Sequence, residues 1–155
     1  MNFTHLIVPL LVLMIPAFGQ LRENIEPLER FCEIREQKLP VTQRLEVLAS
    51  PNGGVSVRGW NRQEILVRAR VETLAPSEGE AKTLASQVQI QAGAGRVSAT
   101  GPEGRNYKEF VWSVSYEVFV PHRIDLKASS VNGGVSISDV EGDISYSTVN
   151  GGVNV

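Results

Sequence analysis

Residues 131–155 read VNGGVSISDVEGDISYSTVNGGVNV, and this stretch decides the fold because its pattern returns every nine residues. The copies are VNGGVSISD at 131–139, VEGDISYST at 140–148 and the incomplete VNGGVNV at 149–155. The first position of each copy is Val and the third is Gly, while the fifth and seventh are apolar. Four positions that match three times without a gap identify an internal repeat.

The nine-residue unit has the chemistry of one corner followed by one short strand. Its fifth and seventh side chains leave the same face of an extended chain because they are two residues apart. The sixth and eighth positions are small and polar and fall on the opposite face: Ser136, Ser138, Ser145, Ser147 and Asn154. The Gly at the third position permits a corner with positive φ. One unit cannot bury its apolar side alone, so the repeat predicts a β-solenoid or stacked β-arches.

Two further segments carry the same pattern. Residues 124–128, IDLKA, fit a degenerate earlier unit with Leu126 and Ala128 in the fifth and seventh positions. Residues 51–57, PNGGVSV, repeat the corner motif far upstream and outside the array. The Asn-Gly pair in that segment favours a tight reversal of the chain.

Strands with a period of two fill much of the remaining chain. Apolar and polar residues alternate over 44–57 and 65–72, which predicts strands with one buried and one wet face. Further strands are expected near 31–38 and at 96–100. The intervening residues 78–87 change to a helical period, with Ser77 and Glu80 as a capping box. The helix is expected to bury Ala81, Leu84, Ala85 and Val88.

The strongest strand pattern lies at residues 107–121, which read YKEFVWSVSYEVFVP. Pro121 is expected to end this strand because Pro cannot donate to a ladder. Its apolar side is predicted to form a core wall and consists of Phe110, Trp112, Val114, Tyr116, Val118 and Val120. The alternative for the aromatic stripe is a platform on which sugars stack. The fold class predicted from all these segments is mainly β, a β-solenoid or stacked-arch repeat with one short helix.

The N-terminus has the pattern of an export signal. Residues 6–18 are an apolar run without a charge, too short to span a membrane as a helix. Ala17-Phe18-Gly19 then fits signal-peptide cleavage before Gln20, although a positive segment ahead of the run is missing. The alternatives are a buried N-terminal strand or a short membrane anchor. The expected organisation is a signal peptide at 1–19, an N-terminal arm at 20–40 and a β domain at 41–155.

Composition excludes several classes of protein. The 155 residues are 42% hydrophobic and 21% charged, which is typical of one globular domain. The formal net charge of −2 is too balanced for a non-specific nucleic-acid binder. One cysteine, Cys32, excludes a disulfide scaffold and a multi-cysteine zinc site. Its neighbours Phe31 and Ile34 predict that Cys32 is buried, the alternatives being a reactive thiol or a bond between chains.

The inventory of reactive residues favours a protein that is not an enzyme. Serine-hydrolase, zinc-protease, nucleotide-binding and dinucleotide-binding motifs are missing from the sequence. His122, after Pro121, is interpreted as a structural or surface residue. A calcium β-roll also repeats every nine residues, but its inner Asp and second Gly pair are not present here. We therefore assign no catalytic, cofactor-binding or metal-binding residue.

The order of these motifs resembles one known family. The chain is similar to the bacterial putative-adhesin domain family of unknown function. The similarity lies in the order of three parts: SPNGGVSVRGWNRQEILVRARVE, then a helix, then YEVFVPHRIDLKASSVNGGVSISDVEGDISYSTVNGGVNV. The resemblance covers about residues 41–155 and rests on the V-N-G-[GD]-[VI]-x-[VI] units and on the Val-Pro pair at 120–121. It implies a β-solenoid-like fold at the cell envelope and no catalytic residue. Because such domains continue through more repeats, the resemblance also implies that the array at 131–155 is truncated.

The leading functional expectation is an exported, non-enzymatic adhesion or scaffold module in the periplasm, cell envelope or extracellular space. It would bind an envelope or surface ligand and, after signal cleavage, would keep no membrane span. The alternative is a polysaccharide-active β-helix enzyme that uses the acidic corner Asp139, Glu141 and Asp143. Residues 149–155 carry no Pro or Lys to guard a β-edge, so we also expect self-association there. Repulsion between acidic corners predicts that salt strengthens this association.

Overall fold

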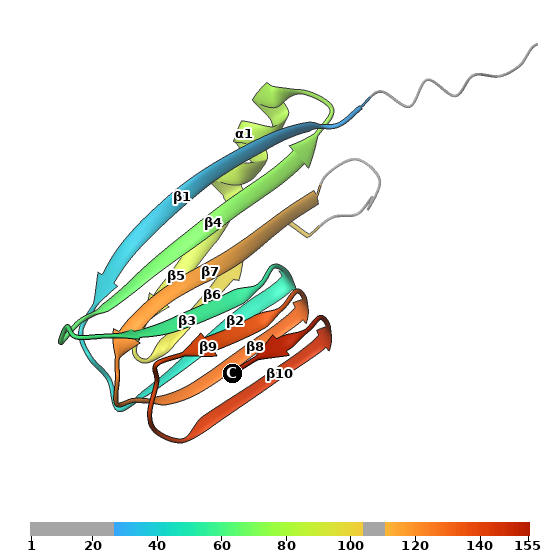
Figure 1. The fold of residues 1–155 in the computed structure, drawn as a ribbon. Coiled ribbons are helices and arrows are strands. Elements are labelled where there is room, and N and C mark those ends of the chain that lie inside the picture. Colours follow the sequence, from blue (N-terminus) through green and yellow to red (C-terminus); the bar gives the residue numbers. More distant parts are fainter. Residues whose placement is uncertain (1–26, 104–110) are drawn as a thin grey trace, which may run out of the picture.

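The computed structural model describes residues 27–103 and 111–155, whose strands form two sheets, with one helix at the upper end of Figure 1. A six-stranded sheet has the strand order β1-β4-β7-β3-β9-β11, and a five-stranded sheet has the order β10-β8-β2-β6-β5. The elements in chain order are β1 (Glu29–Leu39), β2 (Arg44–Asn52), β3 (Val55–Trp60), β4 (Ile65–Ala75), α1 (Glu78–Gln87), β5 (Gln89–Gly93), β6 (Arg96–Thr100), β7 (Val111–Pro121), β8 (Asp125–Asn132), β9 (Val135–Ser138), β10 (Ile144–Asn150) and β11 (Val153–Asn154).

Three β-arches stack on one another in the lower half of Figure 1. Each arch leaves the five-stranded sheet, turns at an Asn-Gly-Gly corner and enters the six-stranded sheet. Arch 1 is β2–β3, arch 2 is β8–β9 and arch 3 is β10–β11. The arches are parallel and in register: one ladder joins Leu45, Leu126 and Ile144, and another joins Val55, Val135 and Val153.

The pairing explains how the nine-residue unit is used. Asn150 lies beside Asn132, 18 residues earlier, so one arch consumes two units, one for each sheet. The degenerate unit at 124–128 is confirmed, because Leu126 pairs with Ile144 and Ala128 with Tyr146. We expected the motif at 51–57 to lie outside the array. This expectation is wrong, because the motif forms the corner of arch 1.

The mainly β class with one short helix is confirmed, but the described residues form two open, mixed sheets and not a solenoid throughout. β1, β4 and β7 pair antiparallel, as do β5 and β6. β1, β4 and β7 are each 11 residues long and have no Asn-Gly-Gly corner. Their side chains therefore alternate between the two faces of the sheet along the whole strand. The sheets enclose a single apolar core that includes Val47, Val67 and Val97.

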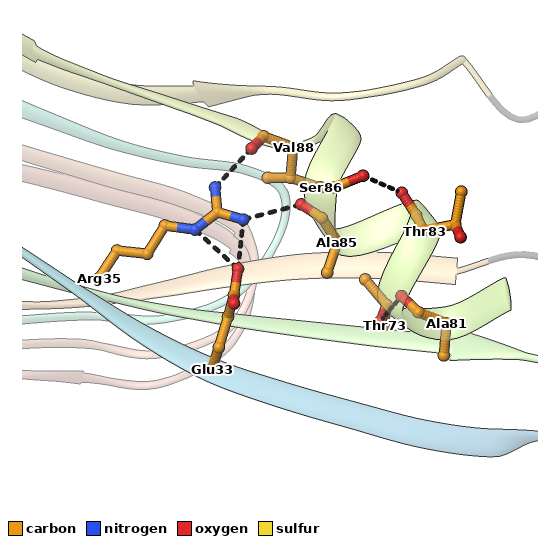
Figure 2. Close-up of polar contacts among 8 residues, drawn as sticks. All are labelled: Glu33, Arg35, Thr73, Ala81, Thr83, Ala85, Ser86 and Val88. Atoms are coloured by element: carbon orange, nitrogen blue, oxygen red, sulfur yellow. Dashed lines mark hydrogen bonds and ion pairs between the residues drawn. The ribbon is translucent and has the colours of Figure 1, made fainter. Parts of the chain in front are cut away.

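Helix α1 has the predicted bounds, and the structure shows what fixes both of its ends. At the start, the Glu80 backbone N–H donates to Ser77 Oγ at 3.3 Å. At the end, Arg35 of β1 donates to the carbonyls of Ala85 and Val88, while Glu33 binds the same guanidinium (Figure 2). A cation at a helix C-terminus interacts favourably with the helix dipole. The sequence predicted a strand near 31–38, but it did not predict that Arg35 of this strand caps the helix.

Strand β7 forms most of the predicted core wall. Val114, Tyr116, Val118 and Val120 are buried, and the strand ends at Pro121 as expected. The Tyr116 hydroxyl is buried without a hydrogen-bond partner in the described part of the chain. Its burial raises the pKa of the Tyr116 phenol well above the ordinary value. The predicted signal peptide and Phe110 lie outside the described residues, and no helix within them is long and apolar enough to cross a membrane.

Candidate functional site

An open groove of about 730 Å³ lies against the five-stranded sheet at the end where the arches turn. Strands β2, β5, β6, β8 and β10 contribute to it, together with the start of β7. Its lining is Leu48, Ala49, Pro51, Gln91, Arg96, Ser98, Ala99, Thr100, Gly101, Trp112, Ser129, Ser130, Val131, Ser147 and Val149. Concave sites with a few polar groups on an apolar surface are the usual places for ligands.

A row of hydroxyls runs through this groove. Ser129 of β8 pairs with Ser147 of β10 on one side and with Leu48 of β2 on the other. Ser98 of β6 adds a third hydroxyl beyond β2. Strand alternation turns these side chains away from the core, because their neighbours Ala128 and Val97 are fully buried. Within the described residues, none of the three hydroxyls has a hydrogen-bond partner, so each is available to a ligand.

An aromatic and aliphatic surface accompanies the hydroxyl row. The Trp112 indole packs on Gly101, where a Cβ would lie only 2.6 Å from the ring. Its Nε1 donates to the Pro102 carbonyl at 3.1 Å, which fixes the plane of the ring. Val149, which also belongs to the groove lining, is 73% exposed. Trp112 was predicted as part of the core wall; it is half-buried, packs against the core and also lines the groove.

Among the described residues that line the groove, Arg96 is the one charged side chain. Its Nη1 lies 3.7 Å from Glu46, which also binds Lys127 at 2.8 Å. The hydrogen bond from Lys127 holds the pKa of the Glu46 carboxyl below its usual value. The described part of the lining thus offers hydroxyls, an amide, an indole and one guanidinium, without a carboxylate or imidazole. These groups can bind a polar ligand, but they do not include a general acid or base.

The acidic corner of the alternative hypothesis lies elsewhere, between β9 and β10. The Glu141 carboxylate is 3.4 Å from Arg123, and both side chains are largely exposed. The Asp143 backbone N–H donates to Asp125 Oδ1 at 3.1 Å. Asp125, Glu141 and Arg123 line a shallow depression there. The corner is therefore an ion-paired surface turn, and among the described residues no cluster of three His, Cys, Asp or Glu could hold a metal.

His122 and Cys32 complete the residues that the sequence singled out. His122 Nδ1 lies 2.7 Å from the Asp139 carbonyl, and Nε2 lies 3.0 Å from Asn61 Oδ1. It thus bridges two turns, which agrees with a structural role. The prediction that Cys32 is buried is wrong: it lies exposed on the outer face of β1, where Arg70 Nε contacts its Sγ at 3.4 Å. Strand alternation places Phe31 on the inner side and sends Cys32 and Ile34 outward.

Sequence reasoning missed the groove because it is assembled from distant segments. The alternating serines of the repeat were interpreted as a polar outer face. These serines are the signal from which the groove could have been located. That Ser129 and Ser147 lie beside each other follows from the 18-residue step of the arches. The positions of Ser98 and Trp112 follow from no local pattern.

Comparison with known proteins gives distant structural similarities only. No protein-family model and no curated protein matches this chain. A putative adhesin from Parabacteroides distasonis is 10% identical, with a TM-score of 0.34, over 78% of this chain and 67% of its own. A putative adhesin from Bacteroides fragilis is 11% identical, with a TM-score of 0.37, over 78% of this chain and 61% of its own. A putative lipid-binding protein from Parabacteroides distasonis is 6% identical, with a TM-score of 0.37, over 68% of this chain and 46% of its own.

Proposed function

We propose that this protein is a non-catalytic adhesion module of the exported kind that binds carbohydrate chains in the groove of the five-stranded sheet. The observation that carries the proposal is a groove whose lining includes the hydroxyls of Ser98, Ser129 and Ser147 and the fixed indole of Trp112. Sugars present hydroxyls in rows and apolar faces that pack on aromatic rings, so the groove matches both features. Export rests on the apolar run at 6–18.

The charge distribution supports neutral or weakly acidic glycans as the ligand class. Arg96 is the only charged group among the lining residues that the structure describes, and it is already near Glu46. A highly charged polyanion would need several cations, because phosphate and sulfate recognition relies on Arg and Lys clusters. Hydrogen bonds from uncharged hydroxyls and contact with Trp112 give modest affinity for each sugar, which suits repeated attachment to a polymer.

The test is an NMR titration of the full chain with a panel of neutral and acidic cell-wall, capsular and mucin-type oligosaccharides. At least one glycan should shift the Trp112 indole signal and the amides of Ser129 and Ser147. The double variant Ser129→Ala/Ser147→Ala should bind about tenfold more weakly, since two hydrogen bonds are lost. The matched control is Ser56→Ala/Ser136→Ala, whose serines pair on the outer face of the other sheet. This control should bind like the unchanged protein.

Two outcomes would contradict the proposal. One is a panel in which no glycan shifts the groove signals, or in which both serine pairs have the same effect. The other is cleavage of a glycan that Asp143→Asn abolishes, since this would make the protein an enzyme acting at the corner between β9 and β10. Release of reducing ends from the same panel measures this second outcome directly.

A further inference from the structure

The outer face of the five-stranded sheet carries a charged row next to the hydroxyls of the groove. Strand register places Arg96 of β6 opposite Glu46 of β2, and Glu46 opposite Lys127 of β8. Ser98 and Ser129 follow the two cations on their strands, each two residues further along. Side chains two residues apart share one face of a strand and are separated by about 6.6 Å. The row of Arg96, Glu46 and Lys127 therefore borders the groove.

The two cations share the Glu46 carboxylate unequally. Lys127 Nζ lies 2.8 Å from Glu46 Oε1, whereas Arg96 Nη1 lies 3.7 Å from Oε2, which is beyond hydrogen-bond distance. The hydrogen bond from Lys127 is also the main cause that lowers the pKa of the Glu46 carboxyl, so Glu46 is ionised at neutral pH. Lys127 thus neutralises Glu46 and leaves the donors of Arg96 available to another acceptor.

The position of Arg96 limits what this acceptor can be. Arg96 lines the groove together with Ser98 and Trp112, and its side chain is 60% exposed, whereas Lys127 lines a separate depression. A guanidinium is a planar fork of N–H donors that matches one carboxylate through two parallel hydrogen bonds. Phosphate-bearing chains are recognised by clusters of cations, but the described lining has only Arg96. The groove therefore offers one carboxylate site beside groups that suit uncharged parts of a sugar.

We propose that Arg96 makes the groove selective for glycans that carry a carboxylate on the sugar ring, as uronic and sialic acids do. Lys127 is a positioning residue in this arrangement: it touches no sugar and acts by binding Glu46. The inference rests on the proposed binding of glycans in this groove. The carboxylate binds at the β6 end of the groove, where hydroxyls of the same sugar or its neighbour reach Ser98.

The experiment uses the full chain and pairs of oligosaccharides that differ only in charge. The acids are tetragalacturonate, tetramannuronate and sialyllactose, and each is compared with its own methyl ester, which keeps the ring hydroxyls. NMR titration measures the Kd of both members and follows the Arg96 Nε–H signal, which should shift only with the acid. For at least one pair the acid should bind about fivefold more tightly, as expected for an exposed ion pair. The preference should shrink in 1 M salt.

A set of variants locates the preference in the charged row. Arg96→Gln should bind both members of a pair equally. Lys127→Gln should reduce the preference to about twofold or less, because the Glu46 carboxylate then turns to Arg96. The double variant Lys127→Gln/Glu46→Gln should restore the preference. The matched control is Arg123→Gln, which removes the same charge at an exposed position outside the groove lining and should keep the full preference.

Four results would overturn the proposal in whole or in part. If each methyl ester binds as tightly as its acid, Arg96 does not select for charge, while glycan binding in the groove stands. An equal loss in Arg123→Gln and Lys127→Gln would make the net charge of the protein the source of the preference. A double variant that does not regain the preference would remove the positioning role of Lys127. If no member of any pair shifts the groove signals, the proposed function fails and this inference fails with it.

Discussion

Arches 2 and 3 have nearly the same corner sequence and opposite environments. Val135 and Val153 both occupy the fifth position of a unit, yet Val135 is 1% exposed and Val153 is 41% exposed. Ile137 and Val155 occupy the seventh position and are 4% and 63% exposed. Within residues 27–103 and 111–155, arch 2 has a neighbour on each side, whereas arch 3 has only arch 2. Burial in a stack is therefore set by the neighbouring arches, and an identical side chain changes its energetic role with its place in the array.

The largest effect is expected when a charge is placed at each of the two equivalent valines, Val135 and Val153. Val135→Asp buries an unpaired carboxylate between the sheets and should lower the free energy of unfolding by about 3 kcal/mol or more. Val153→Asp leaves the carboxylate near solvent and should cost less than about 1 kcal/mol. Urea unfolding followed by circular dichroism measures both. Equal losses would mean that arch 3 is as enclosed as arch 2.

The second test concerns the close approach of the corners. Gly133→Ala forces a Cβ into the Gly53 carbonyl and should destabilise the fold by about 1–3 kcal/mol. Gly151→Ala meets a similar clash with Gly133, but the loss should be smaller because, within the described residues, arch 3 packs against another arch on one side only. Gly152→Ala is the control, since no atom lies within 4 Å of its Cβ. Thermal unfolding of the three variants should rank them in this order, and a loss for Gly152→Ala that matches Gly133→Ala would refute the steric argument.

The same comparison shows how much of the fold could be predicted from the sequence. The units at 131–155, the degenerate unit with Leu126 and Ala128, and helix α1 were all predicted from local periodicity. This worked because each depends on spacing within a few residues. The partner of a strand is a different matter. Val55 lies beside Val135, and nothing in the local pattern of either segment states that 51–57 starts the array.

The candidate site was harder to predict for the same reason. Ser147 was predicted as a polar position of the repeat and Ser129 was not named, but a groove exists only when β6 and the start of β7 are placed around both serines. Cys32 shows that sequence-based prediction can also fail within a single strand. Its apolar neighbours suggested burial, yet β1 lies at the edge of the six-stranded sheet and alternation decides the face that Cys32 occupies.

A third prediction compares the buried Tyr116 with the exposed Tyr146. Tyr116→Phe removes a hydroxyl without a partner in the described residues and should raise the free energy of unfolding by about 1 kcal/mol. Burial raises the folded-state pKa of Tyr116, so the free energy of unfolding falls as pH rises above the unfolded value of about 10. Unfolding at pH 8 and pH 11 should show a steeper alkaline loss in the unchanged protein than in Tyr116→Phe. Tyr146→Phe, which changes a half-exposed side chain, should keep the alkaline loss; if Tyr116→Phe kept it as well, the phenol would not be its source.

The smallest expected effect lies on the outer face of the five-stranded sheet, where arches 1 and 2 carry a charged pair and arch 3 does not. Glu46 binds Lys127 at 2.8 Å, and the next residue along this ladder is the uncharged Ser145. Lys127 lowers the folded-state pKa of Glu46, so the pair contributes stability above the unfolded pKa of about 4.3 and loses it as pH falls through the lower folded value. Glu46→Gln should cost less than about 1 kcal/mol at pH 7, because the pair is partly exposed. The difference from the unchanged protein should vanish near pH 2 and shrink in 1 M salt, whereas Ser145→Gln should show no dependence on either. A difference that persists at pH 2 would mean that Glu46 acts through packing, and the arches would then be joined by their ladders of uncharged residues alone.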